Sequence, residues 1–572
     1  MARRQLRSTN CANRSLGHVH IRQPHFSIAA AAARQQQHRP AVLSQAVNGQ
    51  IDINEIYTSS DSISNPYVGP VKAVRLKVGL GLESSRSLQA GETLLLSTPL
   101  ALISHSAEEL AGASPPTAAA AAASSQGVIP GEDDAGDDAE DDGAADDESG
   151  YDEGGQQYEA TDTDIDQLAE QLAGSSSAHT RAWLQFLDDG SLEPSRTSQL
   201  PDLLAMAALS SSSSSSSEEA SPAAAAAAAP DSSSSSSRQI DDNTLLDITD
   251  LNVQVLVEDD ALLGLNAAAA AAAAGGSSVD DGLAAGFEEP KTLVGIWPEL
   301  NLLQHSCSPN TSVVAHKSAA IVTASRGVAK QAALSRNLLG ANLLAPLGER
   351  RAALQEMTGS KCMCLRCRDE ERTDRNFQQL MAEIHEACIQ QVGPDLEQAV
   401  EVDDEAAMEG LRDQLAAYCE VVDAAFSKFA VKQQTQIWLQ ASLFKLYELT
   451  AIASAACGAV DARLLELLAA LAGEVCPGSS EHIFWARQYR NEIASDEEAY
   501  FDGALRQAEK TLLGAYQARY GYAIVLLALL GVVTAAAGAQ GLSRGRVKQL
   551  VKAAQQPQMQ SDFSSMSEMV SQ

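Results

Sequence analysis

The sequence predicts an α+β protein, and three observations predict this class. Between residues 73 and 103, short alternating apolar and polar segments are interrupted by glycines, which is typical of strands joined by tight turns. Cys307 and the later run Cys362-x-Cys364-x-x-Cys367 have the spacing of a metal site. After these cysteines, apolar residues recur at helical spacing. We therefore expect a β-rich part, a cysteine-bound junction and a helical part.

The basic N-terminus is the first distinct segment. The first acidic residue is Asp52, and the preceding stretch is rich in Arg, Ser, Ala and Gln. This composition favours a transit peptide within residues 1–60 and hence a location in a chloroplast or mitochondrion. The alternatives are a basic arm of the nuclear-localisation kind or a plain disordered tail, with the protein in the nucleus or cytoplasm.

The strand pattern of residues 65–105 is followed by a long low-complexity insertion, residues 106–285. Ala, Ser and acidic tracts dominate it, and aromatic residues make up only 4% of the whole chain. Such segments bury too little apolar surface to offset their chain entropy. We expect a mostly disordered insertion with helical islands at His179–Leu184 and Leu262–Asn266, because long surface insertions cost little loop-closure entropy.

Acidic charge is concentrated within this insertion. The net charge of the chain is −35, and much of it lies between Glu132 and Glu153. Direct binding of nucleic acid is not expected, since phosphate neutralisation needs clustered Lys and Arg. The run is interpreted as a solvated spacer, and the alternative is a surface that attracts a basic partner such as a histone tail.

The cysteines of residues 286–370 predict a zinc site. Structural zinc takes four ligands, and Cys362, Cys364 and Cys367 supply three thiolates from one short loop, with Cys307 as the fourth. The alternative is a set of reduced free thiols. Such a site would staple two distant segments together. The remaining five cysteines are assigned no chemistry: Cys11, Cys388, Cys419, Cys457 and Cys476.

The C-terminal part, residues 373–518, predicts a helical-repeat-like array. Apolar residues recur at helical spacing from Phe377 to Cys388, and this pattern stops at Gly393-Pro394. Further amphipathic helices are expected at 411–426, 437–449, 464–471, 483–493 and 500–516. Residues 521–539 are uncharged and apolar, which predicts a transmembrane helix near the C-terminus, with a buried closing helix as the alternative. Residues 540–572 form a tail.

Three motifs give the chain a resemblance to a known family. They are Gln304-His-Ser-Cys-Ser-Pro-Asn310, the CxCxxC run, and Gly79-x-Gly81 followed by a turn at Gly91. Together they resemble the SET-domain family of S-adenosylmethionine-dependent protein lysine methyltransferases, with its post-SET zinc site. The segments 294–298 and 347–351 look like the SET and MYND branch, although the cysteines of a MYND finger are missing.

The resemblance implies a SET β-fold and particular roles for its residues. Gly79, Gly81, Gln304 and His305 would bind S-adenosylmethionine, and the methyl acceptor would be a lysine of a histone or non-histone protein. Gln304 stands in place of the family's Asn, and Leu338 stands where the family has its catalytic Tyr. The sequence Lys-Gln-Ala-Ala at 330–333 replaces the usual Gly-Glu turn. The leading expectation is a methyltransferase, and the alternative is a catalytically degenerate SET scaffold that binds protein partners through its helical domain.

Overall fold

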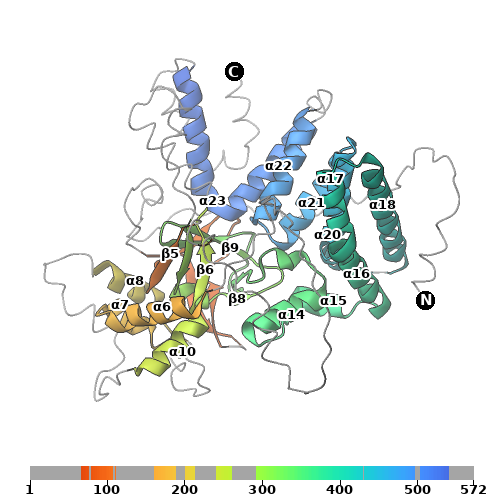
Figure 1. Cartoon of the computed structure of the whole chain (residues 1–572). Coiled ribbons are helices and arrows are strands. Elements are labelled where there is room, and N and C mark those ends of the chain that lie inside the picture. Colours follow the sequence, from red (N-terminus) through yellow and green to blue (C-terminus); the bar gives the residue numbers. More distant parts are fainter. Residues whose placement is uncertain are drawn as a thin grey trace, which may run out of the picture. The chain divides into compact units, whose positions relative to one another are not determined.

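A computed structural model describes residues 66–76, 79–106, 110, 160–187, 200–212, 240–259, 291–429, 431–495 and 503–539 (Figure 1). Side chains are described only to 210 in the fifth of these ranges and to 521 in the last. Several predicted features lie outside the described residues. They are the transit peptide at 1–60, Cys11, the acidic run at 132–153, the island Leu262–Asn266 and the tail 540–572.

Small sheets make up the β-rich part. The largest has the order β1-β4-β10-β9 and is antiparallel throughout, from Tyr67–Val68, Thr93–Ser97, Ala319–Ala324 and Thr311–His316. The strands β2 (Val71–Arg75) and β3 (Leu80–Ser84) form a hairpin. A third sheet has the order β5-β7-β6, from Leu102–His105, Thr292–Gly295 and Gln254–Val257. The short strands β8 (Gln304–His305) and β11 (Ser335–Arg336) pair in parallel.

Glycines close two of the turns, as the sequence predicts. Gly79 has φ +80° in the β2–β3 hairpin, and Gly91 has φ +81° before β4. A left-handed backbone of this kind is readily adopted only by glycine. A Cβ on Gly91 would also lie 2.7 Å from the Gln517 side chain, so this turn is a point of close approach between distant segments.

Most of the described part of the insertion forms helices, whose apolar side chains pack with those of the sheets. They are α6 (Asp162–Gly174), α7 (Ala178–Trp183), α8 (Leu203–Ser212) and α10 (Asp242–Asn252). Leu168, Trp183 and Ile248 are fully buried. The predicted island at 179–184 is therefore confirmed as α7. Strand β6 follows α10 and pairs with β7 at the edge of a sheet. It is not predicted from the sequence, because four residues are too few for a clear alternation.

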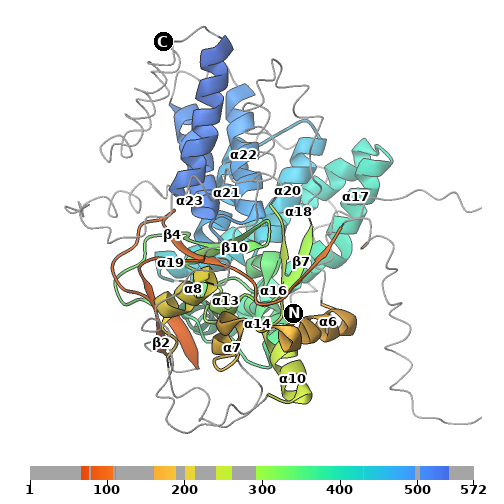
Figure 2. The same ribbon diagram turned by 90° about the vertical axis from the view of Figure 1, so that its left-hand side faces the viewer.

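The C-terminal part is mainly helical, as predicted, and α21, α22 and α23 lie side by side (Figure 2). Short helices α13 (Pro298–Asn301) and η1 (Gly340–Leu344) precede it. The longer helices are α14 (Leu347–Thr358), α15 (Leu365–Glu371), α16 (Arg375–Ala387), α17 (Gly393–Glu401), α18 (Glu405–Lys428), α19 (Gln433–Ala441), α20 (Phe444–Ala456), α21 (Ala462–Val475), α22 (Ser480–Ser495) and α23 (Ala504–Ala539).

Two predicted helix boundaries are wrong. The helix at 377–388 does not stop at Gly393-Pro394, because a π-helical turn, Cys388–Val392, continues directly into α17. Pro394 has no backbone N–H to donate to the preceding turn, and it stands at the start of α17, directly after the change from π-helical to α-helical winding. The segment 437–449 is not one helix: α19 ends before Ser442, and α20 begins at Phe444.

Helix α23 contains a break at Gly521. This residue has φ +78°, and a Cβ there would lie 2.8 Å from the carbonyl oxygen of Gly91. Just before the break, the Oγ1 hydroxyl of Thr323 in β10 donates to the carbonyls of Ala518 and Arg519, each at 3.1 Å. Among the described residues, we find no helix with both the length and the apolar character needed to cross a bilayer. The predicted span 521–539 has helical backbone, but its side chains after 521 lie outside the described residues.

Candidate metal centre

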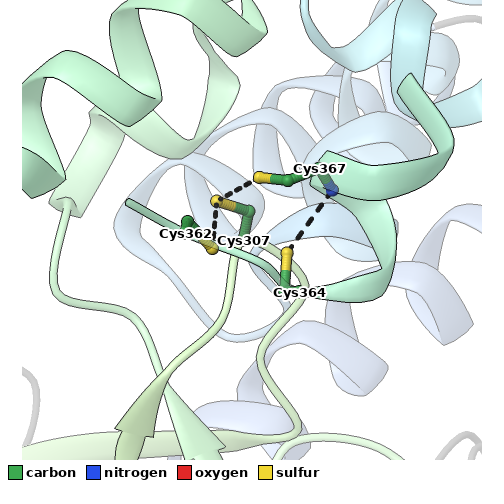
Figure 3. A group of neighbouring side chains, drawn as sticks. All are labelled: Cys307, Cys362, Cys364 and Cys367. Carbon is green, nitrogen blue, oxygen red and sulfur yellow. Dashed lines mark hydrogen bonds between the residues drawn. The ribbon is translucent and has the colours of Figure 1, made fainter. Parts of the chain in front are cut away.

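Four cysteine side chains converge as the sequence predicts. Cys307 follows β8, Cys362 and Cys364 lie between α14 and α15, and Cys367 lies in α15; all four sulfurs are within 4.8 Å of one another (Figure 3). The Sγ of Cys307 is 3.7 Å from that of Cys362 and 3.4 Å from that of Cys367. Tetrahedral zinc with Zn–S bonds of about 2.3 Å places its sulfurs about 3.8 Å apart. The cluster therefore has the size and donor set to hold a metal ion such as zinc.

The local backbone arranges the cluster. Cys364 is the N-cap of α15, and its Sγ accepts a hydrogen bond from the backbone N–H of Cys367 at 3.5 Å. Cys307 and Cys367 are fully buried. The contact with Cys362 raises the pKa of the Cys307 thiol, whereas the contact with Cys307 lowers the pKa of Cys364 to about 6. Some of the four thiols therefore lose their protons more readily than others. A divalent cation that bound all four sulfurs would release the remaining protons.

The ring of His305 contacts the cysteine cluster through Cys307. Its Nδ1 accepts the backbone N–H of Leu338 at 3.3 Å, and its Nε2 is 3.4 Å from the Sγ of Cys307. Because Nδ1 is an acceptor, the neutral ring carries its proton on Nε2 and donates it to the sulfur. His305 therefore supports a metal ligand, as outer-shell hydrogen bonds commonly do.

Two buried arginines lie beside the cysteines and share one carboxylate. The Nη2 of Arg350 is 2.6 Å from Glu370, and the Nε of Arg366 is 2.7 Å from the other oxygen of Glu370. All three side chains are at most 1% exposed. This trio carries one excess positive charge. Four thiolates around a divalent cation carry two excess negative charges, so the surroundings favour a charged metal–thiolate centre.

The same arginines join the cysteine loop to the helical part. Arg366 donates from Nη1 to the backbone carbonyls of Cys307 and Leu343, and from Nη2 to the Ser442 hydroxyl at 3.0 Å. Arg350 donates to the same hydroxyl at 3.0 Å. Burial alone would lower the pKa of Arg350, but the charges of Glu370 and Cys307 outweigh it and raise that pKa. The cysteine cluster and the junction of α19 with α20 are therefore one buried polar unit.

The residues predicted to bind a cofactor lie close to this unit. The Nε2 of Gln304 is 3.5 Å from the carbonyl of Leu80, which lies between Gly79 and Gly81. A Cβ on Gly81 would lie 2.2 Å from the Leu76 side chain, so a larger residue at position 81 would require that side chain to move. The structure thus brings the hairpin, β8 and Leu338 together.

The neighbouring segments are also fixed by hydrogen bonds. The Oδ1 of Asn310 accepts the backbone N–H of Ser335 at 2.8 Å, and its Nδ2 donates to the carbonyl of Ala333 at 2.8 Å. The Lys-Gln-Ala-Ala stretch still forms a turn, and Gln331 adopts a left-handed conformation there with φ +64°. The Lys-Gln-Ala-Ala stretch, which the sequence comparison treats as the loss of a Gly-Glu turn, therefore forms a turn without glycine.

Sequence reasoning missed Arg350, Arg366 and Glu370 as parts of the centre. One signal was present, since Arg366 and Glu370 are four residues apart on a helix and so lie on one face. The partnership of Arg350 with the same carboxylate had no local signal. Comparison of the chain with models of known protein families gives no match, and comparison with curated proteins gives none either.

Proposed function

We propose that this chain is a protein lysine N-methyltransferase of the SET type, which uses S-adenosylmethionine and holds structural zinc at Cys307, Cys362, Cys364 and Cys367. The single observation that carries the proposal is the convergence of the Gly79–Gly81 hairpin, β8 and Leu338 beside the cysteine cluster. These segments come from three separate stretches of sequence. The resemblance assigns the hairpin and β8 to the cofactor pocket and Leu338 to the methyl-transfer channel.

The zinc would hold the pocket together and take no part in methyl transfer. Four thiolates leave no open coordination position, which is typical of structural zinc. The buried guanidinium groups of Arg350 and Arg366 would offset the charge of the loaded centre. Zinc binding would therefore contribute directly to folding.

The chain's own contribution to methyl transfer would be binding and alignment. S-adenosylmethionine supplies the reactive methyl group when bound, and the protein must orient a neutral lysine amine and exclude water. The backbone of the hairpin at Gly79 and Gly81 would lie against the cofactor, and Gln304 would offer its amide. Leu338 brings no hydroxyl to polarise the channel, so transfer is expected to be slow.

Titration calorimetry of the full chain with S-adenosylmethionine tests cofactor binding. We expect measurable heat, and transfer of a labelled methyl group to a protein lysine. Leu338→Tyr should increase the transfer rate, since it restores the hydroxyl that hydrogen-bonds in the family's channel. Leu339→Tyr is the matched control and should not increase it. No heat at millimolar cofactor would contradict the proposal.

A second function is favoured by two observations. Leu338 carries no hydroxyl, and both ring nitrogens of His305 are already engaged within the chain. A degenerate SET scaffold that binds protein partners through α16–α22 would need neither group. In that case saturating S-adenosylmethionine does not change the affinity of the chain for its partner proteins. Leu338→Tyr then produces no methyl transfer.

The location follows from separate features and is tested separately. We propose organellar targeting by residues 1–60 and a membrane anchor at 521–539. A fluorescent reporter fused to residues 1–60 should be directed to an organelle. A reporter fused to residues 521–539 should be directed to a membrane. A diffuse cytosolic signal from both fusions would contradict these two proposals and leave the enzymatic one intact.

A further inference from the structure

Cys364 is the most exposed of the four cysteines at the metal centre. The other three are buried, whereas Cys364 is partly exposed. Its neighbours on both sides face solvent, since Met363 is 60% and Leu365 is 57% exposed. The loop therefore presents Cys364 at the edge of the centre, where a small reagent in solution meets the cysteines first.

Cys307 is the thiol that each cysteine of the loop 362–367 can reach. Its Sγ contacts the sulfurs of all three and lies 3.4 Å from that of Cys367 and 3.7 Å from that of Cys362 (Figure 3). The Sγ atoms of Cys307 and Cys364 are within 4.8 Å of each other. A disulfide bond holds its sulfurs about 2 Å apart, so a movement of at most about 3 Å would bring these two to bonding distance.

The sulfurs of a loaded centre are in the form that reacts with oxidants. A divalent metal binds cysteines as thiolates, and the thiolate is the nucleophile toward a peroxide. The buried trio of Arg350, Arg366 and Glu370 adds one excess positive charge beside them. Partial exposure next to positive charge is the setting in which cysteines are oxidised site-selectively. The centre combines both conditions at one edge.

We propose that the metal centre is also a site of reversible oxidation, at which hydrogen peroxide converts Cys364 and Cys307 into a disulfide and the metal is released. The Cys364 thiolate attacks one peroxide oxygen, so that an S–O bond forms, the O–O bond breaks and hydroxide leaves. The Cys307 thiolate then attacks the Cys364 sulfur, so that the S–S bond forms, the S–O bond breaks and a second hydroxide leaves. The two sulfurs together lose two electrons, which the peroxide gains, and two protons from solvent turn the hydroxides into water.

The disulfide would replace the metal as the link between the two segments. Two thiolates remain, which are too few for a structural zinc site, so the divalent cation leaves. The oxidised chain should lose the cooperative unfolding of the loaded chain, but its segments stay joined. A thiol reductant together with zinc should therefore restore the centre, whereas oxidation to a sulfinic acid would not be reversed in this way. The inference rests on the metal of the proposed function and not on methyl transfer.

Treatment of the full chain with peroxide tests the reaction. The chain is loaded with zinc under reducing conditions and then freed of reductant. Equimolar hydrogen peroxide should release one zinc ion per chain, followed with a chromophoric zinc indicator, and should remove two free thiols. Reductant and zinc should reverse both changes. Thiols that are lost without release of zinc, or zinc that does not rebind after reduction, would overturn the proposal.

Peptide mapping without reduction identifies the bond. Trypsin separates the peptide 292–317, which holds Cys307, from the peptide 362–366, which holds Cys362 and Cys364. We expect these two peptides to be linked, with fragment spectra that place the bond on Cys364. Any other pairing, or the absence of a disulfide, would overturn the proposal.

Two matched variants test the order of attack. Cys364→His and Cys362→His each leave three thiolates and one imidazole, a ligand set that still binds zinc. Cys364→His lacks the exposed thiol, so peroxide should release its zinc at least about 10-fold more slowly than the zinc of Cys362→His. Equal rates would overturn the proposal. If either variant fails to bind zinc, the peptide map of the wild-type chain decides.

The same measurements separate this inference from the proposed function. If the wild-type chain binds no zinc, the zinc site of the proposed function fails. The peptide map of the metal-free chain then decides the oxidation site, because the four sulfurs converge in the structure without a metal. Zinc that is bound but resists peroxide would overturn this inference and leave the proposed function intact.

Discussion

The metal centre and a second cluster of polar side chains hold their guanidinium groups in different ways. The second cluster consists of Arg336, Gln254, Asn301 and Asn252 and is called the amide chain below. At the metal centre, Arg350 and Arg366 share the Glu370 carboxylate at 2.6 and 2.7 Å, and the cysteine sulfurs lie beside them. In the amide chain, the Nη1 of Arg336 donates to the neutral amide of Gln254 at 2.9 Å, and no acidic side chain pairs with it among the described residues. The first region pairs its two cations with a carboxylate of the chain, whereas the second orients its cation with neutral amide side chains.

Helix α13 extends this contrast. Glu299 lies in the same short helix as Asn301 of the amide chain and is 3% exposed. Its carboxyl group accepts a hydrogen bond from the Ser97 hydroxyl, and no cationic side chain contacts it in the described structure. Burial raises the pKa of Glu299 to about 7. Removal of one partner of a buried ion pair is strongly destabilising because it leaves an uncompensated charge. A buried titratable group without a cationic partner makes the stability of the fold depend on pH.

The largest effect should come from losing a metal ligand. Cys307→Ser is expected to abolish metal binding and cooperative unfolding, because structural zinc binding is worth on the order of 10 kcal/mol, comparable with the stability of a whole domain. Elemental analysis together with thermal unfolding measures both. Cys388→Ser is the control: this thiol is fully buried but outside the cluster, and the variant should keep its metal. Wild-type protein that folds without any metal would contradict this prediction.

The next effect should come from the shared carboxylate. Glu370→Gln removes the carboxylate that pairs directly with two buried guanidinium groups, and we expect a loss of about 3–5 kcal/mol in the free energy of unfolding. Urea denaturation measures it. The control is Glu371→Gln, in the same helix as Glu370. It removes the exposed partner of Arg351 and should cause a much smaller loss in the free energy of unfolding. Equal losses in the two variants would mean that burial of the pair has no energetic consequence.

A pH effect should follow from Glu299. Its folded pKa, about 7, lies above the unfolded value of 4.5. Its contribution to stability is therefore fully present below pH 4.5 and is lost as pH rises through 7, by about 3 kcal/mol in total. Glu299→Gln keeps the shape and stays neutral, so this variant should lose less stability than wild type between pH 5 and 8. Parallel curves of unfolding free energy against pH would rule out a buried carboxyl with a raised pKa.

The smallest effect should come from His305. His305→Phe removes the hydrogen bond to the Cys307 sulfur, and outer-shell changes of this kind weaken metal binding by about 10-fold. Cobalt substitution gives a direct measurement, since the sulfur-to-metal absorption bands should shift and chelators should remove the metal faster. His385→Phe is the control, because His385 pairs with Glu349 away from the cysteines. Unchanged bands would show that His305 does not donate to the sulfur.

The helical part was predictable from sequence to the extent that its signals are local. The spacing of Phe377, Met381 and Ile384 indicates a buried helix face, and the structure buries all three in α16. The end of that helix was not predictable in the same way. Packing of the turn Cys388–Val392 carries the chain past a Gly-Pro pair that usually ends a helix.

The sequence by itself determined the features that depend on residues close together in the chain. They are the spacing of the CxCxxC cysteines, the glycine turns and the helical periodicity. Tertiary structure alone decided the rest. Arg366 meets Ser442 across 76 residues, and Arg336 meets Gln254 across 82. Such partners have no fixed spacing, because they are chosen by how the sheets and helices pack. Whether a buried charge is matched or left open therefore becomes visible only when the segments are assembled.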